Sequence, residues 1–260
     1  MKINLVKWRL MLATLPITLS VVGLKVLLVR VFQFEGLFDY SDITLIITGG
    51  IFLVGFMLAG TLSDYKESER LPALMAGTLE SIEDTLNVAY LFKGNFELKA
   101  QKHKLLEVTD SIIRYFAHQA TEAQVYRQME QITEIAIHVE RTGMGSTTSW
   151  VKREQANLRQ FFSRTTVIKR TPFLATGYAF LVVLTVVIIL VLLVCRFESF
   201  LLSLLLVSFL THIFTYMIYL IRDIDHPFEY PTNGRVRAAD IDLFPLTEYR
   251  QRAAERLETT

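Results

Sequence analysis

The sequence predicts an all-α integral membrane protein with four transmembrane helices and a helical cytoplasmic domain inserted between the second and the third. Two observations carry this prediction. First, 52% of the 260 residues are apolar, and they gather in two blocks near the ends of the chain. Second, a long polar segment separates the blocks. The net charge is only +1, so the charge balance predicts no nucleic-acid partner.

Each apolar block contains two runs that are long enough to cross a lipid bilayer. The four predicted spans cover residues 10–32, 43–62, 173–195 and 199–221. A helix of roughly 20 residues, at about 1.5 Å per residue, crosses a hydrocarbon core of about 30 Å. The first run is long and lacks a small-residue cleavage site, so it is interpreted as a retained helix and not as a signal peptide.

The positions of the basic residues predict the orientation. Loop 33–42 contains no Lys or Arg, whereas basic residues flank the opposite ends of the spans. They are Lys2, Lys7, Arg9, Lys66, Arg70, Arg164, Lys169, Arg170 and Arg222. Because basic residues favour the cytoplasmic side, both termini are expected in the cytoplasm, and the plasma (inner) membrane is the expected location.

Four segments follow from this pattern: spans one and two (1–62), a cytoplasmic helical domain (63–171), spans three and four (172–222) and a cytoplasmic tail (223–260). Apolar periodicity predicts helices over 71–92, 105–115 and 125–139, and a fourth from Trp150 that continues to the third span, with Pro172 in the first turn of that span. Breaks are expected at 94–95, near 120–121 and at 143–145. Thr121 and Gln124 have the spacing of a capping box. No strand is predicted.

The sequence offers no catalytic chemistry. It contains no Gly-rich phosphate loop, no metal-spaced His or Cys cluster and no nucleophile elbow, so no enzyme activity and no cofactor are predicted. The single thiol, Cys195, cannot form an intramolecular disulfide. A lipid-modifying enzyme is the least favoured alternative.

The second span combines small residues with aromatic ones. Thr48, Phe52 and Phe56 recur at steps of four and therefore share one helix face, next to Gly55. Small residues allow close helix packing, which is one interpretation. The other is a pore-lining helix, in which the aromatic residues form rings that gate by dewetting.

Two further polar features lie within the spans. The fourth span carries a stripe that should face protein or water and not lipid. Its members are Ser208, His212, Thr215, Tyr219 and Arg222. Packing between helices is favoured over permeation for this stripe. Lys25 either extends toward the headgroups or, with Arg30, forms a cationic outer vestibule.

Four short motifs resemble the bestrophin anion channels and their bacterial and plant relatives. Phe52-Leu53-Val54-Gly55-Phe56 resembles the neck of the bestrophin pore helix, and Glu69-Arg70-Leu71-Pro72 resembles the segment that follows it. After the fourth span, Asp225-His226-Pro227-Phe228 and the acidic stretch 240–246 are similar to two further bestrophin segments. The order of spans and cytoplasmic segments also agrees.

This resemblance implies a homopentameric chloride or other anion channel whose second span lines the pore. It implies a neck formed by Thr48, Phe52, Gly55 and Phe56, and an inner mouth containing Asp64, Glu67, Glu69 and Arg70. Two positions depart from the bestrophin pattern. Thr48 replaces an aliphatic residue, and an acidic cluster replaces a basic one at the inner mouth. The acidic cluster argues against strong chloride selectivity. Asp240 and Asp242 are possible oxygen ligands for calcium.

The alternative function is a membrane-anchored helical interaction or signalling protein that conducts nothing. In that case the glycines of the second span serve packing, and residues 64–170 bind a partner. The predicted partners are the lipid bilayer, further copies of the chain and inorganic ions. A monomer or a dimer would favour the alternative, because neither can surround a pore.

Overall fold

The computed structural model describes residues 2–92, 97–141, 143, 145–171, 175–230 and 239–258. The secondary structure of these residues is helical, apart from one short pair of bridging strands. The chain divides into two compact units. The first comprises 1–65, 172–226 and 235–239, and the second comprises 66–171, 227–234 and 240–260. Helix α2 (Tyr40–Phe92) contributes residues to both units.

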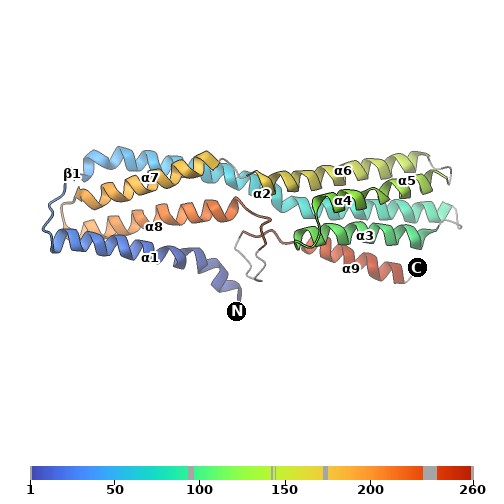
Figure 1. Ribbon diagram of the computed structural model, residues 1–260, viewed down its shortest axis with the longest axis horizontal. Helices are drawn as coiled ribbons and strands as arrows, with labels where there is room; N and C mark the ends of the chain where they lie inside the picture. Colours follow the sequence, from blue (N-terminus) through green and yellow to red (C-terminus); the bar gives the residue numbers. More distant parts are fainter. Residues whose placement is uncertain are drawn as a thin grey trace. The chain divides into compact units, whose positions relative to one another are not determined.

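The first unit contains α1 (Lys2–Arg30), the beginning of α2, α7 (Ala175–Val194) and α8 (Phe200–Ile224). Helix α8 lies beside both α1 and α7 (Figure 1). The core of the unit comes from α2, α7 and α8, through Ile43, Ile47, Val54, Met57, Leu181, Ile188, Leu192, Val207, Leu210 and Phe214. Four described helices are long and apolar enough to cross a membrane: Trp8–Arg30, Tyr40–Phe92, Gly177–Val194 and Phe200–Ile224. The predicted fold class, an all-helical membrane protein with four spans, is therefore confirmed.

A strand pair that the sequence does not predict joins the two loops at one end of this unit. β1 (Phe38–Asp39) pairs in parallel with β2 (Cys195–Arg196), Phe38 opposite Cys195. Gly36, in the loop before β1, has a φ of 97° and lies close to Arg196. A Cβ on Gly36 would be 2.8 Å from the Arg196 backbone nitrogen. Only glycine combines this backbone conformation with this close approach. Two residues per strand leave no readable periodicity in the sequence.

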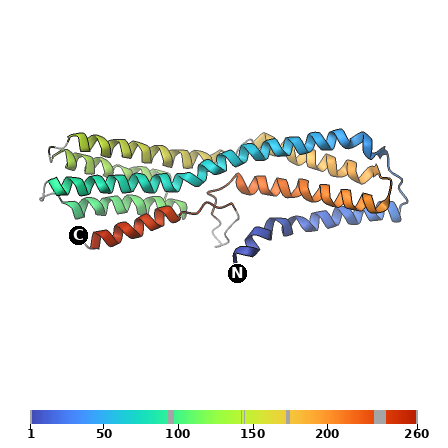
Figure 2. The same ribbon diagram turned by 180° about the vertical axis from the view of Figure 1, so that it is seen from behind.

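The second unit contains the rest of α2 together with α3 (Leu98–Phe116), α4 (Glu122–Met129), α5 (Gln131–Glu140), α6 (Gly145–Arg170) and α9 (Phe244–Glu258). Figure 2 shows these helices from the opposite side. Apolar stripes at helical spacing meet in its core, including Met75, Leu79, Ile82, Leu86, Leu105, Val108, Ile112, Val125, Met129, Ile132, Val139, Val151, Leu158 and Phe162. The predicted capping box is present, because Thr121 and Gln124 bond reciprocally at the start of α4.

Three details differ from the predicted helices. The 71–92 helix is not separate but continues α2 through Pro72. The expected 125–139 helix is divided at Glu130 into α4 and α5. The Glu130 N–H donates to the Arg127 carbonyl three residues earlier, which interrupts the α-helical hydrogen bonding. The apolar pattern nevertheless continues across this position. Helix α6 begins at Gly145 and not at Trp150, and it ends at Arg170. The breaks expected at 94–95 and at 144, and the placement of Pro172, lie outside the described residues.

The predicted tail contains a helix that packs on the second unit. Helix α9 lies against α3 and buries Leu246, Tyr249 and Ala253. The Arg256 guanidinium donates to both carboxylate oxygens of the buried Glu83, at 2.9 and 2.6 Å. Burial, together with the nearby Glu83 charge, raises the pKa of Tyr249 far above its usual value.

Candidate pore-lining face and its neighbours

The four residues of the predicted neck lie on one exposed face of α2. The Phe52 side chain is 76% exposed and that of Phe56 is 70% exposed. Thr48 and Gly55 are exposed beside them, and the Thr48 hydroxyl donates to the Thr44 carbonyl at 2.8 Å. The opposite face of α2, with Ile43, Ile47, Val54 and Met57, packs into the core of the first unit. The described helices of the chain therefore leave the aromatic face of α2 uncovered.

The glycines of α2 divide between these two faces. A Cβ on Gly50 would lie 2.6 Å from Ile188 Cδ1 and 3.3 Å from the Phe214 ring, so this glycine permits α2 to approach α7 and α8. A Cβ on Gly49 or Gly55 would meet nothing within 4 Å. The packing interpretation of the small residues therefore applies to Gly50, whereas Gly49 and Gly55 make no such contact with the residues that the structure describes.

The four residues predicted at the inner mouth also belong to α2, but their charges are not all free. Glu67 receives two hydrogen bonds from the Arg164 guanidinium, at 2.7 and 2.6 Å. Asp64 is half-buried, whereas Glu69 and Arg70 are exposed. The expected acidic cluster is thus partly neutralised, because Arg164 compensates one of its carboxylates.

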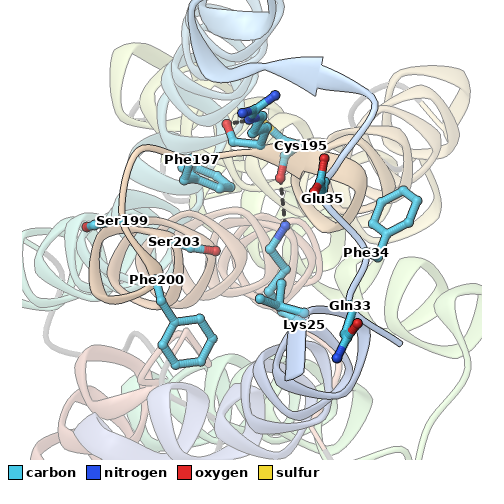
Figure 3. Close-up of a pocket in the computed structure, with 11 residues that line it drawn as sticks. Lys25, Gln33, Phe34, Glu35, Cys195, Phe197, Ser199, Phe200 and Ser203 are labelled. Atoms are coloured by element: carbon cyan, nitrogen blue, oxygen red, sulfur yellow. Dashed lines mark hydrogen bonds between the residues drawn. The ribbon is translucent and has the colours of Figure 1, made fainter. Parts of the chain in front are cut away.

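Lys25 is buried in the first unit, and its role in an outer vestibule stays a prediction. Its side chain is only 2% exposed, and Nζ donates to the carbonyls of Leu192, Leu193 and Cys195 at 3.3, 2.8 and 2.7 Å (Figure 3). These carbonyls end α7 and continue into β2, and the last carbonyls of a helix lack intrahelical donors. A cation that satisfies them also complements the negative end of the helix dipole, which explains why a buried lysine is stable here. Arg30 is exposed, and its guanidinium lies 4.3 Å from the centre of the Phe200 ring.

The polar stripe of α8 makes a contact with α1. His212 Nδ1 lies 3.2 Å from the Thr18 hydroxyl, and Thr215 is buried and donates to the Thr211 carbonyl. Ser208 and His212 are half-buried, and Tyr219 and Arg222 are exposed. The contact from Thr18 to His212 is what packing between helices requires. The sequence analysis missed Thr18, although a hydroxyl one turn after Thr14 within an apolar run was a readable signal.

The possible calcium ligands Asp240 and Asp242 stay a prediction. Among the described residues, no three His, Cys, Asp or Glu side chains are placed to hold a metal ion. Asp242 instead accepts a hydrogen bond from the Phe244 N–H at the start of α9, at 2.9 Å. The two bestrophin-like segments near Asp242 do come together, because Ile241 N–H donates to the Pro227 carbonyl and the Tyr230 hydroxyl donates to the Ile241 carbonyl.

The sequence matches no protein-family model and no curated protein, but the fold matches solved structures. A bacterial bestrophin homologue from Klebsiella pneumoniae superposes with a TM-score of 0.73 at 10% identity, over 93% of this chain and 97% of that chain. A mutant bestrophin homologue from the same species gives 0.74 at 10% identity, over 95% and 99%. A crystal structure of a membrane protein gives 0.72 at 10% identity, over 97% and 99%. The resemblance noted in the sequence is therefore confirmed at the level of the fold: this chain is an integral membrane protein with the fold of the bacterial bestrophin homologues.

Proposed function

We propose that the chain is one subunit of an ion channel, in which several copies surround an axis and α2 lines the pore. The observation that carries this proposal is the exposed aromatic face of α2. Its exposed residues recur at helical spacing as Ser41, Thr44, Thr48, Phe52, Phe56 and Ala59. A surface intended only for lipid has no need of hydroxyls and bare glycines in the middle of a span.

The channel fold of the bestrophins, which this chain resembles in sequence motifs and matches in architecture, supports the same arrangement. On this basis we propose a homopentamer. Five copies would turn each exposed aromatic side chain into a ring around the axis. Phe52 and Phe56 are four residues apart, so the two rings would be separated by about 6 Å along a helix.

The proposed neck gates the pore by excluding water from a hydrophobic constriction. Two successive aromatic rings narrow the pore and exclude water, while Thr48 offers a hydroxyl to a partly hydrated ion beside them. The bare backbone at Gly55 keeps the space between the rings open. The aromatic rings then set the barrier to permeation.

We propose that the permeating ions are anions. The bestrophin resemblance supports this choice, and the partial neutralisation of the inner mouth removes one argument against it. Because Arg164 holds both oxygens of Glu67, this carboxylate presents less negative charge to a passing anion. We further propose that both termini are cytoplasmic in the plasma membrane, as the basic residues indicate.

The proposal is tested by replacing both aromatic residues with alanine. Phe52→Ala combined with Phe56→Ala should raise the single-channel conductance of the purified protein in a planar bilayer, because the dry constriction widens. Phe180→Ala is the matched control, since Phe180 lies on α7 and is also 57% exposed. If the double variant conducts like the wild type, or if the purified wild type carries no current and elutes as a monomer or dimer, the non-conducting interaction protein is the better account.

A further inference from the structure

A pocket of about 380 Å³ lies within the first unit, where α1 ends and α8 begins. It is distinct from the exposed face of α2, because no α2 residue lines it. Phe34, Phe197 and Phe200 line it, together with Lys25 and Ser203 (Figure 3). Arg196 also lines the pocket. Neither the fold nor the proposed pore explains why these groups converge.

The hydroxyl of Ser203 is a buried polar group that lacks a hydrogen bond within the part of the chain that the structure describes. The residue is 3% exposed, and its Oγ has no hydrogen-bond partner among the described residues. By contrast, the buried hydroxyls of Thr18, Thr61 and Thr215 each donate to a backbone carbonyl one turn earlier. Thr185 and Thr211 share the unpaired state of Ser203 but do not line this pocket. Figure 3 shows the Ser203 oxygen turned toward the side of the pocket formed by Lys25. Buried polar groups are normally satisfied, so this hydroxyl indicates a missing partner inside the pocket.

The first turn of α8 adds a further donor. Ser199 caps the helix by accepting the Leu202 N–H at 3.2 Å on its hydroxyl and the Ser203 N–H at 3.0 Å on its carbonyl. For the N–H group of Phe200, which lines the pocket, the described residues provide no hydrogen-bond acceptor. The beginning of a 25-residue helix carries partial positive charge and favours an anion.

The charged residues around the pocket favour the same sign. Lys25 and Arg196 are the cations that line it, and Glu35 is the acid. All three donors of the Lys25 ammonium are occupied by carbonyls, so this residue supplies charge but no free hydrogen bond. Among the described residues, Arg196 has no ion-pair partner, and its guanidinium can therefore bind an oxyanion in a bidentate manner.

We propose that this pocket binds the oxyanion group of an organic molecule, either a carboxylate or a phosphate ester. The Ser203 hydroxyl, the Phe200 N–H and the Arg196 guanidinium donate to its oxygens. The aromatic walls contact its carbon skeleton, and the volume of the pocket exceeds that of a single inorganic ion. Two sources could supply this chemistry: a free organic acid from the aqueous phase, or the phosphate of a lipid headgroup that enters from the bilayer.

The test measures binding and does not depend on conduction. The full chain is purified in detergent, stripped of lipid, and its thermal midpoint is recorded at constant ionic strength. The probes are benzoate, glycerol 3-phosphate and a short-chain phosphatidic acid, and sodium chloride at the same ionic strength is the control. We expect at least one organic probe to raise the midpoint saturably, since a ligand that binds only the folded state stabilises it.

The variants decide whether the pocket is the binding site. Ser203→Ala removes one hydrogen bond to a charged group and should weaken binding about ten-fold, and Arg196→Gln should weaken it by at least as much. Ser208→Ala, on the same helix but outside the pocket, should bind like the wild type. A response to the soluble acids identifies a free ligand, and a response to the lipid alone identifies a headgroup. The inference is overturned if no organic probe shifts the midpoint, or if Ser203→Ala binds as tightly as the wild type.

Discussion

Two glycines five residues apart on α2 should respond in opposite ways to the same substitution. Gly50 faces the core of its own chain, and a Cβ there would already lie 2.6 Å from Ile188 Cδ1. Gly55 has no atom within 4 Å of the corresponding position. Replacing each glycine by leucine therefore compares an occupied site with an open one on a single helix.

The magnitudes follow from these contacts. Leucine in a helix interior is favoured over glycine by about 1 kcal/mol, which applies to both variants. At position 50 the added side chain must displace Ile188 and Phe214, which are both 1% exposed and closely packed. Overpacking a closed core costs about 1–3 kcal/mol for a few methylenes, and it should exceed the gain in helix propensity here. We expect Gly50→Leu to lower the unfolding free energy by about 1 kcal/mol, and Gly55→Leu to leave it unchanged or raise it slightly.

The assay is thermal unfolding of both purified variants in the same detergent, followed by circular dichroism, with size-exclusion chromatography to record assembly. Gly55→Leu should fold and assemble but conduct less than the wild type, because the new side chain would enter the space between the aromatic rings. Equal midpoints for the two variants, or a lower midpoint for Gly55→Leu, would refute the assignment of the two faces of α2.

Three further perturbations test contacts elsewhere in the chain. Lys25→Met should destabilise the protein by at least about 2 kcal/mol in chemical denaturation, because three carbonyls lose their donor; an unchanged midpoint would contradict the capping role. Thr121→Ala should cost about 1 kcal/mol by removing the capping box of α4, whereas Thr121→Ser should restore it. Tyr249 has a raised pKa because it is buried beside Glu83, so its phenol keeps its proton in the folded state while the unfolded chain ionises near pH 10. The stability it contributes is present below that pH and is lost as the pH rises above it. Urea midpoints measured between about pH 8 and 11 should fall less steeply for Tyr249→Phe, and parallel curves would argue against this assignment.

Much of the fold could be predicted because hydrophobic length and helical periodicity are local signals. The four spans required only apolar runs of sufficient length, and the start of α4 was readable from Thr121 and Gln124. The bridge between β1 and β2 could not be predicted, because two residues per strand carry no pattern and the pairing joins distant loops. The division at Glu130 was also hidden, since the apolar steps continue across it.

The site was less predictable, because a helix sequence does not say which face its own chain will cover. The stretch around Phe52 and Phe56 identified a shared face, but only the packing of Gly50 against Ile188 and Phe214 shows which side is left exposed. The partners of Lys25 could not be predicted for the same reason. Its partners are backbone carbonyls at the end of α7, and backbone groups leave no trace in the residue types of a sequence.

Substituted-cysteine accessibility measures most directly whether the Phe52 face lines a conducting pore. The native thiol, Cys195, is buried, so a new cysteine at an exposed position can be labelled selectively. A membrane-impermeant, water-soluble thiol reagent should modify Phe52→Cys and block its current in a planar bilayer, whereas Phe180→Cys on α7 should remain unmodified. If the cysteine at position 52 resists the reagent, or if it is modified while the current persists unchanged, then α2 does not line the pore.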